Sequence, residues 1–247
     1  MRKFLALCGF HLRVFARNGY FVWLTVGSTL SLLLLQSVAA YAAGVPLEAA
    51  VWLRAGVFGL WSCATTAAGA VGFQRFQGTL PYLLNSATSD LVSLAALLVP
   101  AASFGLLSFP LAFAGALLLG AQAALPTAAM LAAIAMLWLG AVVLDFGIAA
   151  FFVLTPNALV YEELITLPIM LAAGLFTLPP ALQGIGAALR WVLPIAAPVH
   201  LLLEGAAFGF WEIAQFAVST LLWLVLSRVL ARRLLDAARA GGKLGVM

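Results

Sequence analysis

The sequence predicts an all-α integral membrane protein: six transmembrane helices, an N-terminal amphipathic interfacial helix and a broken re-entrant element before the last span. Composition is the first reason, because 65% of the 247 residues are hydrophobic and only 8% are charged, against about 25% charged in soluble domains. The second is that the charged residues leave long uncharged stretches, and a crossing helix needs only about 20 apolar residues. The third is that apolar residues in these stretches do not alternate with polar ones, which excludes a membrane barrel.

The number of spans follows from the lengths of the uncharged stretches. The stretch between Asp90 and Asp145 is too long for one crossing, so we divide it at a turn near 122–126. We find no linker or internal repeat, and we treat 1–247 as a single transmembrane domain. The predicted spans are 20–42, 52–72, 91–119, 126–154, 164–180 and 209–230.

The basic residues predict the orientation. With six spans, ten of the twelve Lys and Arg residues fall on one side of the membrane, and only Arg54 and Arg190 fall on the other. The positive-inside rule then places both termini in the cytoplasm, in the cell (inner) membrane. The net charge of +4 is accounted for by these flanks, so no nucleic-acid partner is expected. The ten residues are Arg2, Lys3, Arg13, Arg17, Arg75, Arg228, Arg232, Arg233, Arg239 and Lys243.

Residues 1–18 predict a helix that lies in the cytoplasmic interface. On a helical wheel the four basic residues of this segment share one narrow arc. The opposite, apolar face is expected to consist of Phe4, Leu5, Cys8, Leu12 and Phe15. Cys8 and Cys63 have no metal-ligand spacing, and we expect no disulfide between them.

Three connections carry most of the remaining polar residues. Residues 73–90 form the first cytoplasmic connection, and a short second one ends at Glu162 and Glu163. Residues 179–208 contain four prolines as well as Arg190, His200 and Glu204. This segment is too polar and too interrupted for a crossing. We therefore expect short extracytoplasmic re-entrant helices that are covered by protein.

The sequence has no motif for catalysis in this chain. It lacks a phosphate-binding loop and an HExxH zinc motif, and with two histidines no metal site is expected. Glu162-Glu163 is similar to a paired-glutamate motif of intramembrane proteases, but position 167 is Leu where that motif has Arg. A polytopic intramembrane enzyme is therefore the weaker alternative.

A few residues within the membrane region are candidates for a translocation path or a subunit interface. Asp145 stands inside a predicted span, where a charge suggests function unless water or an Arg near the headgroups satisfies it. His200 and Glu204 are four residues apart, so they form either a proton or ligand site or a simple hydrogen-bonded pair. Phe104 and Phe109 either line a cavity for apolar cargo or pack against lipid. Arg54 is most simply a snorkelling anchor.

The segment Gln77-Gly78-Thr79-Leu80-Pro81-Tyr82-Leu83-Leu84-Asn85-Ser86 resembles the "G-T-L-x-x-L-L-x-S-P" segment between spans two and three in membrane subunits of ABC exporters of the type-two permease family. The order of elements is similar to that family over the whole chain. Two departures are the absence of acidic residues at 73–77 and Ala87 in place of the closing Pro.

The resemblance implies a non-catalytic permease that pairs with a second copy or a related permease and binds two ATPase subunits, which would carry ATP and Mg. Residues 73–90 would be the coupling segment that seats in the ATPase. The expected cargo is hydrophobic or amphipathic: a drug-like natural product, a peptide or a lipid. A haem-export-type permease is the nearby alternative, and a channel or scaffold is a more distant one. The residues expected to couple to the ATPase are Arg75, Phe76, Gln77, Gly78, Thr79, Leu80, Tyr82, Leu83, Glu162 and Glu163.

Overall fold

The computed structural model describes residues 2–76, 90–152, 158–177, 179–205 and 207–240. Within these ranges the chain is predominantly helical and contains no β-strand, which confirms the predicted all-α class. In chain order the elements are α1 (Arg2–Arg17), α2 (Gly19–Ala43), α3 (Val51–Phe76), α5 (Asp90–Gly105), α6 (Ser108–Leu118), α7 (Ala128–Phe152), α8 (Ala158–Ala172), the 3-10 turn η1 (Pro180–Leu182), α9 (Gln183–Leu189), α10 (Ala196–Leu203) and α11 (Phe210–Ala240).

Four helical segments of the described chain are long and apolar enough to cross a membrane, as in a multi-pass membrane protein. They are Gly19–Ala43, Val92–Leu118, Ala128–Phe152 and Phe210–Arg233. The boundaries of each segment lie within three residues of those of a predicted span. The predicted span 52–72 lies within α3, which is not among the four. The predicted span 164–180 is wrong in its second half, because α8 ends at Ala172 and Gly174 turns the chain out of the helix, and α8 is not among the four either.

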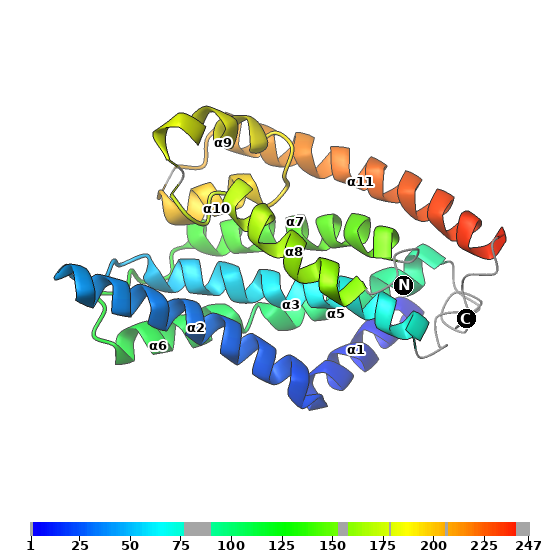
Figure 1. The fold of residues 1–247 in the computed structure, drawn as a ribbon, viewed down its shortest axis with the longest axis horizontal. Helices are drawn as coiled ribbons and strands as arrows, with labels where there is room; N and C mark the ends of the chain where they lie inside the picture. Colours follow the sequence, from blue (N-terminus) through cyan, green and yellow to red (C-terminus); the bar gives the residue numbers. More distant parts are fainter. Residues whose placement is uncertain (1, 77–89, 153–157, 178, 206, 241–247) are drawn as a thin grey trace.

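The helices form an elongated bundle (Figure 1). Helices α2, α3, α5 with α6, α7, α8 and α11 run lengthwise, and successive ones run in opposite directions. One end holds the start of α1, the end of α3, the start of α5 and the end of α11. We call it the terminal end. The opposite end, which we call the loop end, holds the connections 44–50 and 119–127 and the chain from 173 to 209.

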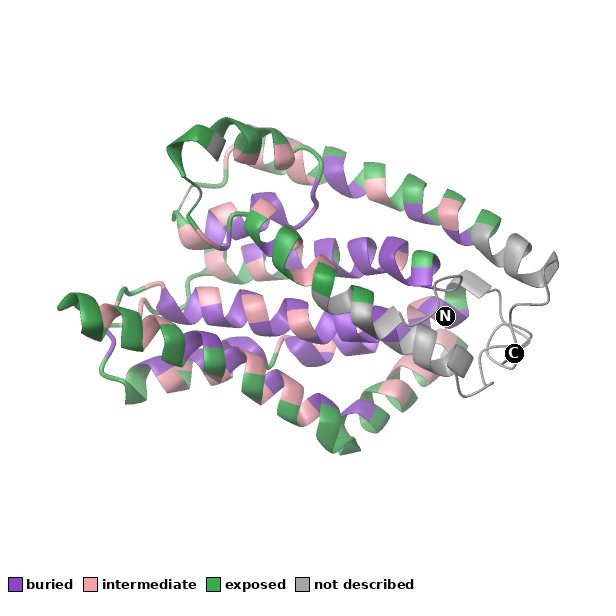
Figure 2. Ribbon diagram, in the orientation of Figure 1, coloured by how far each residue is buried: buried purple, intermediate pink, exposed green. Residues whose placement is uncertain are grey.

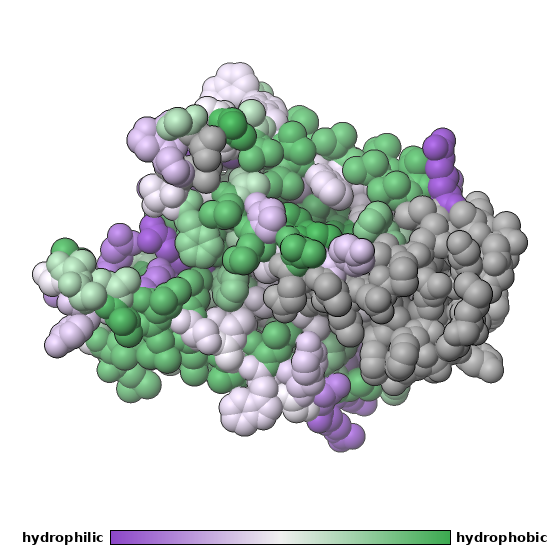
Figure 3. All heavy atoms as spheres, in the orientation of Figure 1, coloured by the Kyte–Doolittle hydropathy of each residue, from purple (hydrophilic) through white to green (hydrophobic). Residues whose placement is uncertain are grey.

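The surface view agrees with a bundle that spans a bilayer. In Figure 3, apolar side chains cover much of the visible face, whereas hydrophilic side chains gather at the loop end and at a few separate places along the edge of the molecule. The outer helices α2 and α11 expose large apolar side chains such as Leu35, Val38 and Leu221. In water such a surface would be unfavourable, but in lipid it is the normal exterior.

The core lies along α3 and α7 (Figure 2). Helix α3 contacts α2, α5, α6, α7, α8 and α10, and its small residues permit this crowding. A Cβ atom on Gly59 would overlap the side chains of Thr29 of α2 and Ser108 of α6, and a Cβ atom on Gly56 would overlap the ring of Phe109. Glycines at these positions therefore decide how closely α2 and α6 approach α3.

The span that the sequence places at 91–119 is interrupted between α5 and α6. Pro110 lies in the first turn of α6 and cannot donate to the carbonyl of residue 106, so the regular helix breaks just before it. Pro100, in contrast, lies inside α5 without ending it. The break brings Gly105 close to α3, where an added Cβ would lie 3.0 Å from the Leu60 carbonyl oxygen.

Helix α1 forms as predicted, and only part of its expected apolar face packs against protein. Phe15 is buried and Phe4 and Cys8 are half-buried, whereas Leu5 and Leu12 remain exposed on the outside of the bundle. In their place Leu7 and His11 turn inward. The reason is that α1 contacts α5 and α2, so protein rather than a lipid surface selects its inner face. Cys8 and Cys63 are both free thiols, as predicted.

His11 makes the packing of α1 sensitive to pH. Burial lowers the pKa of His11 below its ordinary value of 6.5, so the residue is neutral in the folded state at pH 7. As the pH falls through 6.5, His11 takes up a proton more readily in the unfolded state than in the folded state. The free energy of unfolding therefore decreases as the pH decreases. We expect the melting temperature of the detergent-purified protein to drop between pH 7.5 and 5.5. In His11→Phe the drop should be smaller, and an unchanged drop would assign it to other groups.

Candidate functional site

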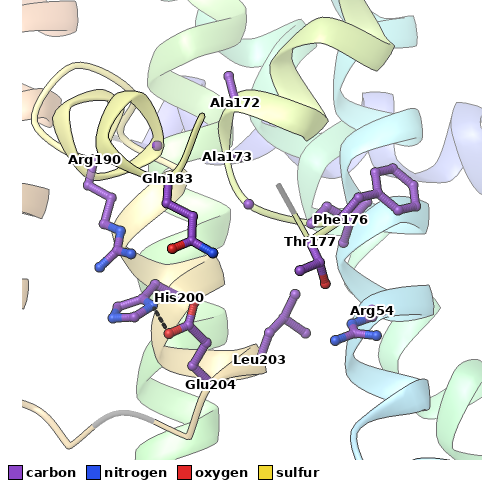
Figure 4. Close-up of a pocket in the computed structure, with 13 residues that line it drawn as sticks. Arg54, Ala172, Ala173, Phe176, Thr177, Gln183, Arg190, His200, Leu203 and Glu204 are labelled. Atoms are coloured by element: carbon purple, nitrogen blue, oxygen red, sulfur yellow. Dashed lines mark ion pairs between the residues drawn. The ribbon is translucent and has the colours of Figure 1, made fainter. Parts of the chain in front are cut away.

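A cavity of about 350 Å³ opens at the loop end, and its lining includes polar and ionisable residues from four parts of the chain. Arg54 comes from the first turn of α3, Gln183 from the start of α9 and His200 from α10, and Glu204 follows α10 directly. Arg190 follows α9 directly. In Figure 4 these side chains and Thr177 surround one space, with Arg190, Gln183, His200 and Glu204 on one side and Arg54 on the other. We call this cavity the loop-end pocket.

The backbone that frames the loop-end pocket is held by specific local contacts. After α8, Gly174 adopts a φ of +84°, a left-handed conformation that favours glycine and turns the chain out of the helix. On the other side, the Trp223 Nε1 of α11 donates to the Val192 carbonyl at 2.8 Å. Gly140 of α7 lets the Pro194 carbonyl approach so closely that an added Cβ would lie 2.6 Å from its oxygen.

Helices α9 and α10 divide the segment 179–208 into an outer and an inner part. Helix α9 has no buried residue among those described, whereas α10 buries most of its length against α7, α11 and α3. His200 and Glu204 therefore stand on a rigid support, while Gln183 and Arg190 come from the surface side. The pocket lies between the two parts.

Two close ion contacts organise the charges. Arg54 Nη1 lies 3.1 Å from Glu48 Oε2, and His200 Nδ1 lies 3.0 Å from Glu204 Oε2. His200 Nδ1 makes no aligned hydrogen bond with a described residue, so the second contact is a close approach of the ring to the carboxylate rather than a hydrogen bond. Arg54 also has a buried Nε that makes no hydrogen bond with the part of the chain that the structure describes. Arg190 makes no ion pair with any residue that the structure describes.

The structure brings together three of the candidate residues and separates the others. Arg190, His200 and Glu204 line the loop-end pocket. Asp145 is fully buried in α7, and Phe104 and Phe109 belong to the core, where Phe109 lies edge-on to Trp52. A role for these last three residues in a translocation path stays a prediction.

The residues expected to couple to an ATPase lie largely outside the described part of the chain. Gln77, Gly78, Thr79, Leu80, Tyr82 and Leu83 are outside the described residues. Arg75 and Phe76 are the last two residues of α3, and Glu162 and Glu163 belong to the first half of α8. For all four residues the structure describes the backbone alone. These four positions all lie towards the terminal end.

Sequence reasoning missed Arg54 as a member of the pocket. Arg54 is more than 130 residues from Arg190 in the chain, so no local pattern connects them. It also missed a groove of about 300 Å³ between α2, α3 and α8, whose hydroxyl residues are Ser28, Ser62, Thr65, Thr66 and Thr166. Ser62, Thr65 and Thr66 are spaced so that they share one face of a helix, and this spacing could have predicted a polar face on α3.

Three of these hydroxyls donate within their own helices, from Ser28 to Leu24 O at 2.7 Å, Ser62 to Phe58 O at 2.9 Å and Thr65 to Trp61 O at 3.0 Å. The donors are thus satisfied in an apolar surrounding, and the oxygens stay available as acceptors. These hydroxyl groups can therefore face lipid without the energetic cost of an unsatisfied donor.

No group of three or more His, Cys, Asp or Glu residues that could hold a metal ion occurs among the described residues. Comparison with protein-family models, curated proteins and solved structures found no match to this chain. The site must therefore be interpreted from its own geometry and from the sequence.

Proposed function

We propose that this chain is the membrane subunit of an ATP-driven exporter of the ABC type-two permease family, and that it moves a hydrophobic or amphipathic substrate out of the cytoplasm or the inner leaflet. The observation that supports this most is the segment 77–86, with its Gly-Thr-Leu and following Leu-Leu. Because the chain carries no phosphate-binding loop, the ATPase would be a separate subunit bound at the terminal end.

The position of this segment in the chain favours the proposal. Helix α3 ends at Phe76 and α5 begins at Asp90, and both positions lie at the terminal end, near α1. Helix α1 contacts α5 directly. A push on a coupling segment between α3 and α5 would therefore act on the most buried helix and on the amphipathic helix together.

The proposal includes six spans, with α3 and α8 as the second and fifth. Helix α3 has 26 residues, or about 39 Å at 1.5 Å per residue, enough to cross a bilayer core of about 30 Å. Its lower hydropathy comes from Arg54 at one end and from hydroxyls whose donors bond within the helix. In the middle of the bundle, α3 is covered by other helices and needs little apolar surface. Helix α8 is shorter, with 15 residues, and it packs against α3.

Under this topology, residues 179–208 form the extracytoplasmic re-entrant element, with α10 as its inserted part. Both termini then face the cytoplasm, and the hydroxyl-lined groove between α2, α3 and α8 lies within the membrane. Such a groove offers hydrogen-bond acceptors beside apolar walls formed by Trp23 and Phe58. This combination suits an amphipathic cargo better than a purely hydrocarbon one.

The assignment is tested by isolating the tagged chain from its own cells in mild detergent. We expect a nucleotide-binding subunit to co-purify in a stoichiometric complex that hydrolyses ATP in proteoliposomes and is inhibited by vanadate. A complex that contains no nucleotide-binding subunit would overturn the proposal and favour a channel, a scaffold or an enzyme.

The coupling role of Gly78 is tested in the same reconstituted complex. In Gly78→Trp, a bulky side chain replaces the glycine of the proposed turn, and we expect substrate-stimulated ATP hydrolysis to fall by at least about tenfold with normal membrane insertion. Tyr41→Trp is the matched control, because Tyr41 is 88% exposed at the loop end. Equal stimulation in wild type and Gly78→Trp would contradict the coupling assignment.

A further inference from the structure

We propose that the loop-end pocket binds the phosphate group of a phospholipid headgroup, with Arg190 as its principal ligand and Arg54 as the second. The proposal goes beyond transport, because it concerns a lipid site on the chain itself, and it does not depend on an ATPase partner. It rests on the charges, the shape and the surroundings of the pocket.

Charge is the first argument. Among the described residues, the pocket is lined by two guanidinium groups, an imidazole and one carboxylate, that of Glu204, which is 64% exposed and lies against His200. Arg190 is half-buried and has no acidic partner among the described residues. A partly desolvated arginine without a counter-ion is unfavourable, and an anion from outside would satisfy it.

Donor geometry is the second argument. Arg54 Nη1 lies against Glu48, but the buried Nε of Arg54 has no hydrogen-bond partner among the described residues. Gln183 adds an amide and Thr177 a hydroxyl to the lining. In Figure 4, the Arg190 and Gln183 side chains extend from the α9 side into the space that Arg54 and Thr177 border from the opposite side. Guanidinium and amide donors that converge from two sides match the several acceptor oxygens of a phosphate.

The surroundings indicate that the phosphate comes from a lipid. The chain near the pocket exposes aromatic side chains: Trp211 is 63% exposed, Phe210 is 77% exposed, and Trp191 lies edge-on to Trp211 at 6.3 Å. Tryptophan in this setting marks the depth of the headgroups. Within the pocket, Phe176 and Leu203 add apolar surface next to the charges, as the junction of headgroup and acyl chains requires.

The experiment measures binding of short-chain phosphatidylglycerol to the full-length protein by calorimetry in a maltoside detergent, which carries no phosphate. Wild type should bind, and Arg190→Gln should weaken the dissociation constant by about tenfold or more. Arg190→Lys should lose less, because it keeps the charge but not the planar fork. Arg228→Gln, on the exposed side of α11 towards the terminal end, is the matched control and should bind like wild type.

Glu204→Gln is expected to change the binding affinity in the opposite direction. Removing the carboxylate of Glu204 from the pocket lining should tighten phosphatidylglycerol binding about threefold, because its repulsion of the phosphate is lost. A merely structural role of the pocket would weaken binding in both variants. Arg190 makes no ion pair with a described residue, so its substitution should not lower the melting temperature, which separates a binding defect from unfolding.

The source of the phosphate is tested with glycerol 3-phosphate, which has the same chemistry without acyl chains. Much weaker binding of glycerol 3-phosphate would support the lipid assignment. Equal binding would overturn it in favour of a soluble phosphate ester. If neither ligand shows binding that depends on Arg190, the pocket is not a phosphate site.

Discussion

Truncating Trp52 to alanine is expected to lower the free energy of unfolding by about 3–5 kcal/mol. Trp52 is 2% exposed, and its ring lies edge-on to Phe113 at 5.2 Å and to Phe109 at 6.4 Å. The substitution removes the largest side chain at the start of α3 and leaves a cavity that rigid helices cannot close. The measurement is loss of helical circular dichroism during titration of detergent-purified protein with sodium dodecyl sulfate.

Two further variants make this test specific. Trp23→Ala removes the same side chain from a position that is 74% exposed on α2, and we expect a change of about 0.5 kcal/mol at most. Trp52→Phe keeps a ring in place and removes a buried indole N–H that has no hydrogen-bond partner among the described residues. Its cost should be about 1.5 kcal/mol or less. Equal losses for Trp52→Ala and Trp23→Ala would contradict the packing described for α3.

The second large effect is expected at Gly59, where α2, α3 and α6 meet. Gly59→Leu would place a side chain in the space occupied by Thr29 and Ser108, both fully buried. Because these atoms belong to two different neighbouring helices, relief requires both α2 and α6 to move away from α3. We expect destabilisation of about 3 kcal/mol, together with a lower yield of folded protein.

The matched control is Gly27→Leu, because nothing lies within 4 Å of a Cβ atom at Gly27. Leucine is the better helix former, so this variant should be neutral or gain up to about 1 kcal/mol. Both variants are compared by the same denaturant titration. If Gly59→Leu is as stable as Gly27→Leu, α2 and α6 do not approach α3 as closely as the structure places them.

The helices that face lipid were predictable because hydropathy is a local property. Spans expected at 20–42 and 126–154 appear as Gly19–Ala43 and Ala128–Phe152, since each needs only its own apolar length. Helix α11 continues to Ala240, well past the expected end at 230. Its last turns carry Arg232 and Arg233, and a hydropathy criterion ends a span at such charges although the helix itself continues.

Packing between helices was less predictable. The helical wheel placed Phe15 on the apolar face of α1, and Phe15 is buried, but the wheel did not show that His11 would be partly buried while Leu12 stays exposed. Likewise, Pro100 and Pro110 both lie within the third predicted span, and nothing in the sequence distinguishes their effects. In the structure only Pro110 follows a helix break. The difference arises because the break lets Gly105 approach α3, and that contact is long-range.

The sequence alone determined that this is a helical membrane protein with an amphipathic start, since an apolar excess and the lack of charge over 20 residues leave no other stable arrangement in lipid. Only the tertiary structure decided which charges meet. Arg54, expected as an isolated anchor, stands with Arg190, His200 and Glu204 in one pocket. The physical reason is that helix formation depends on neighbours along the chain, whereas the pocket depends on how α3, α8 and α10 pack across it.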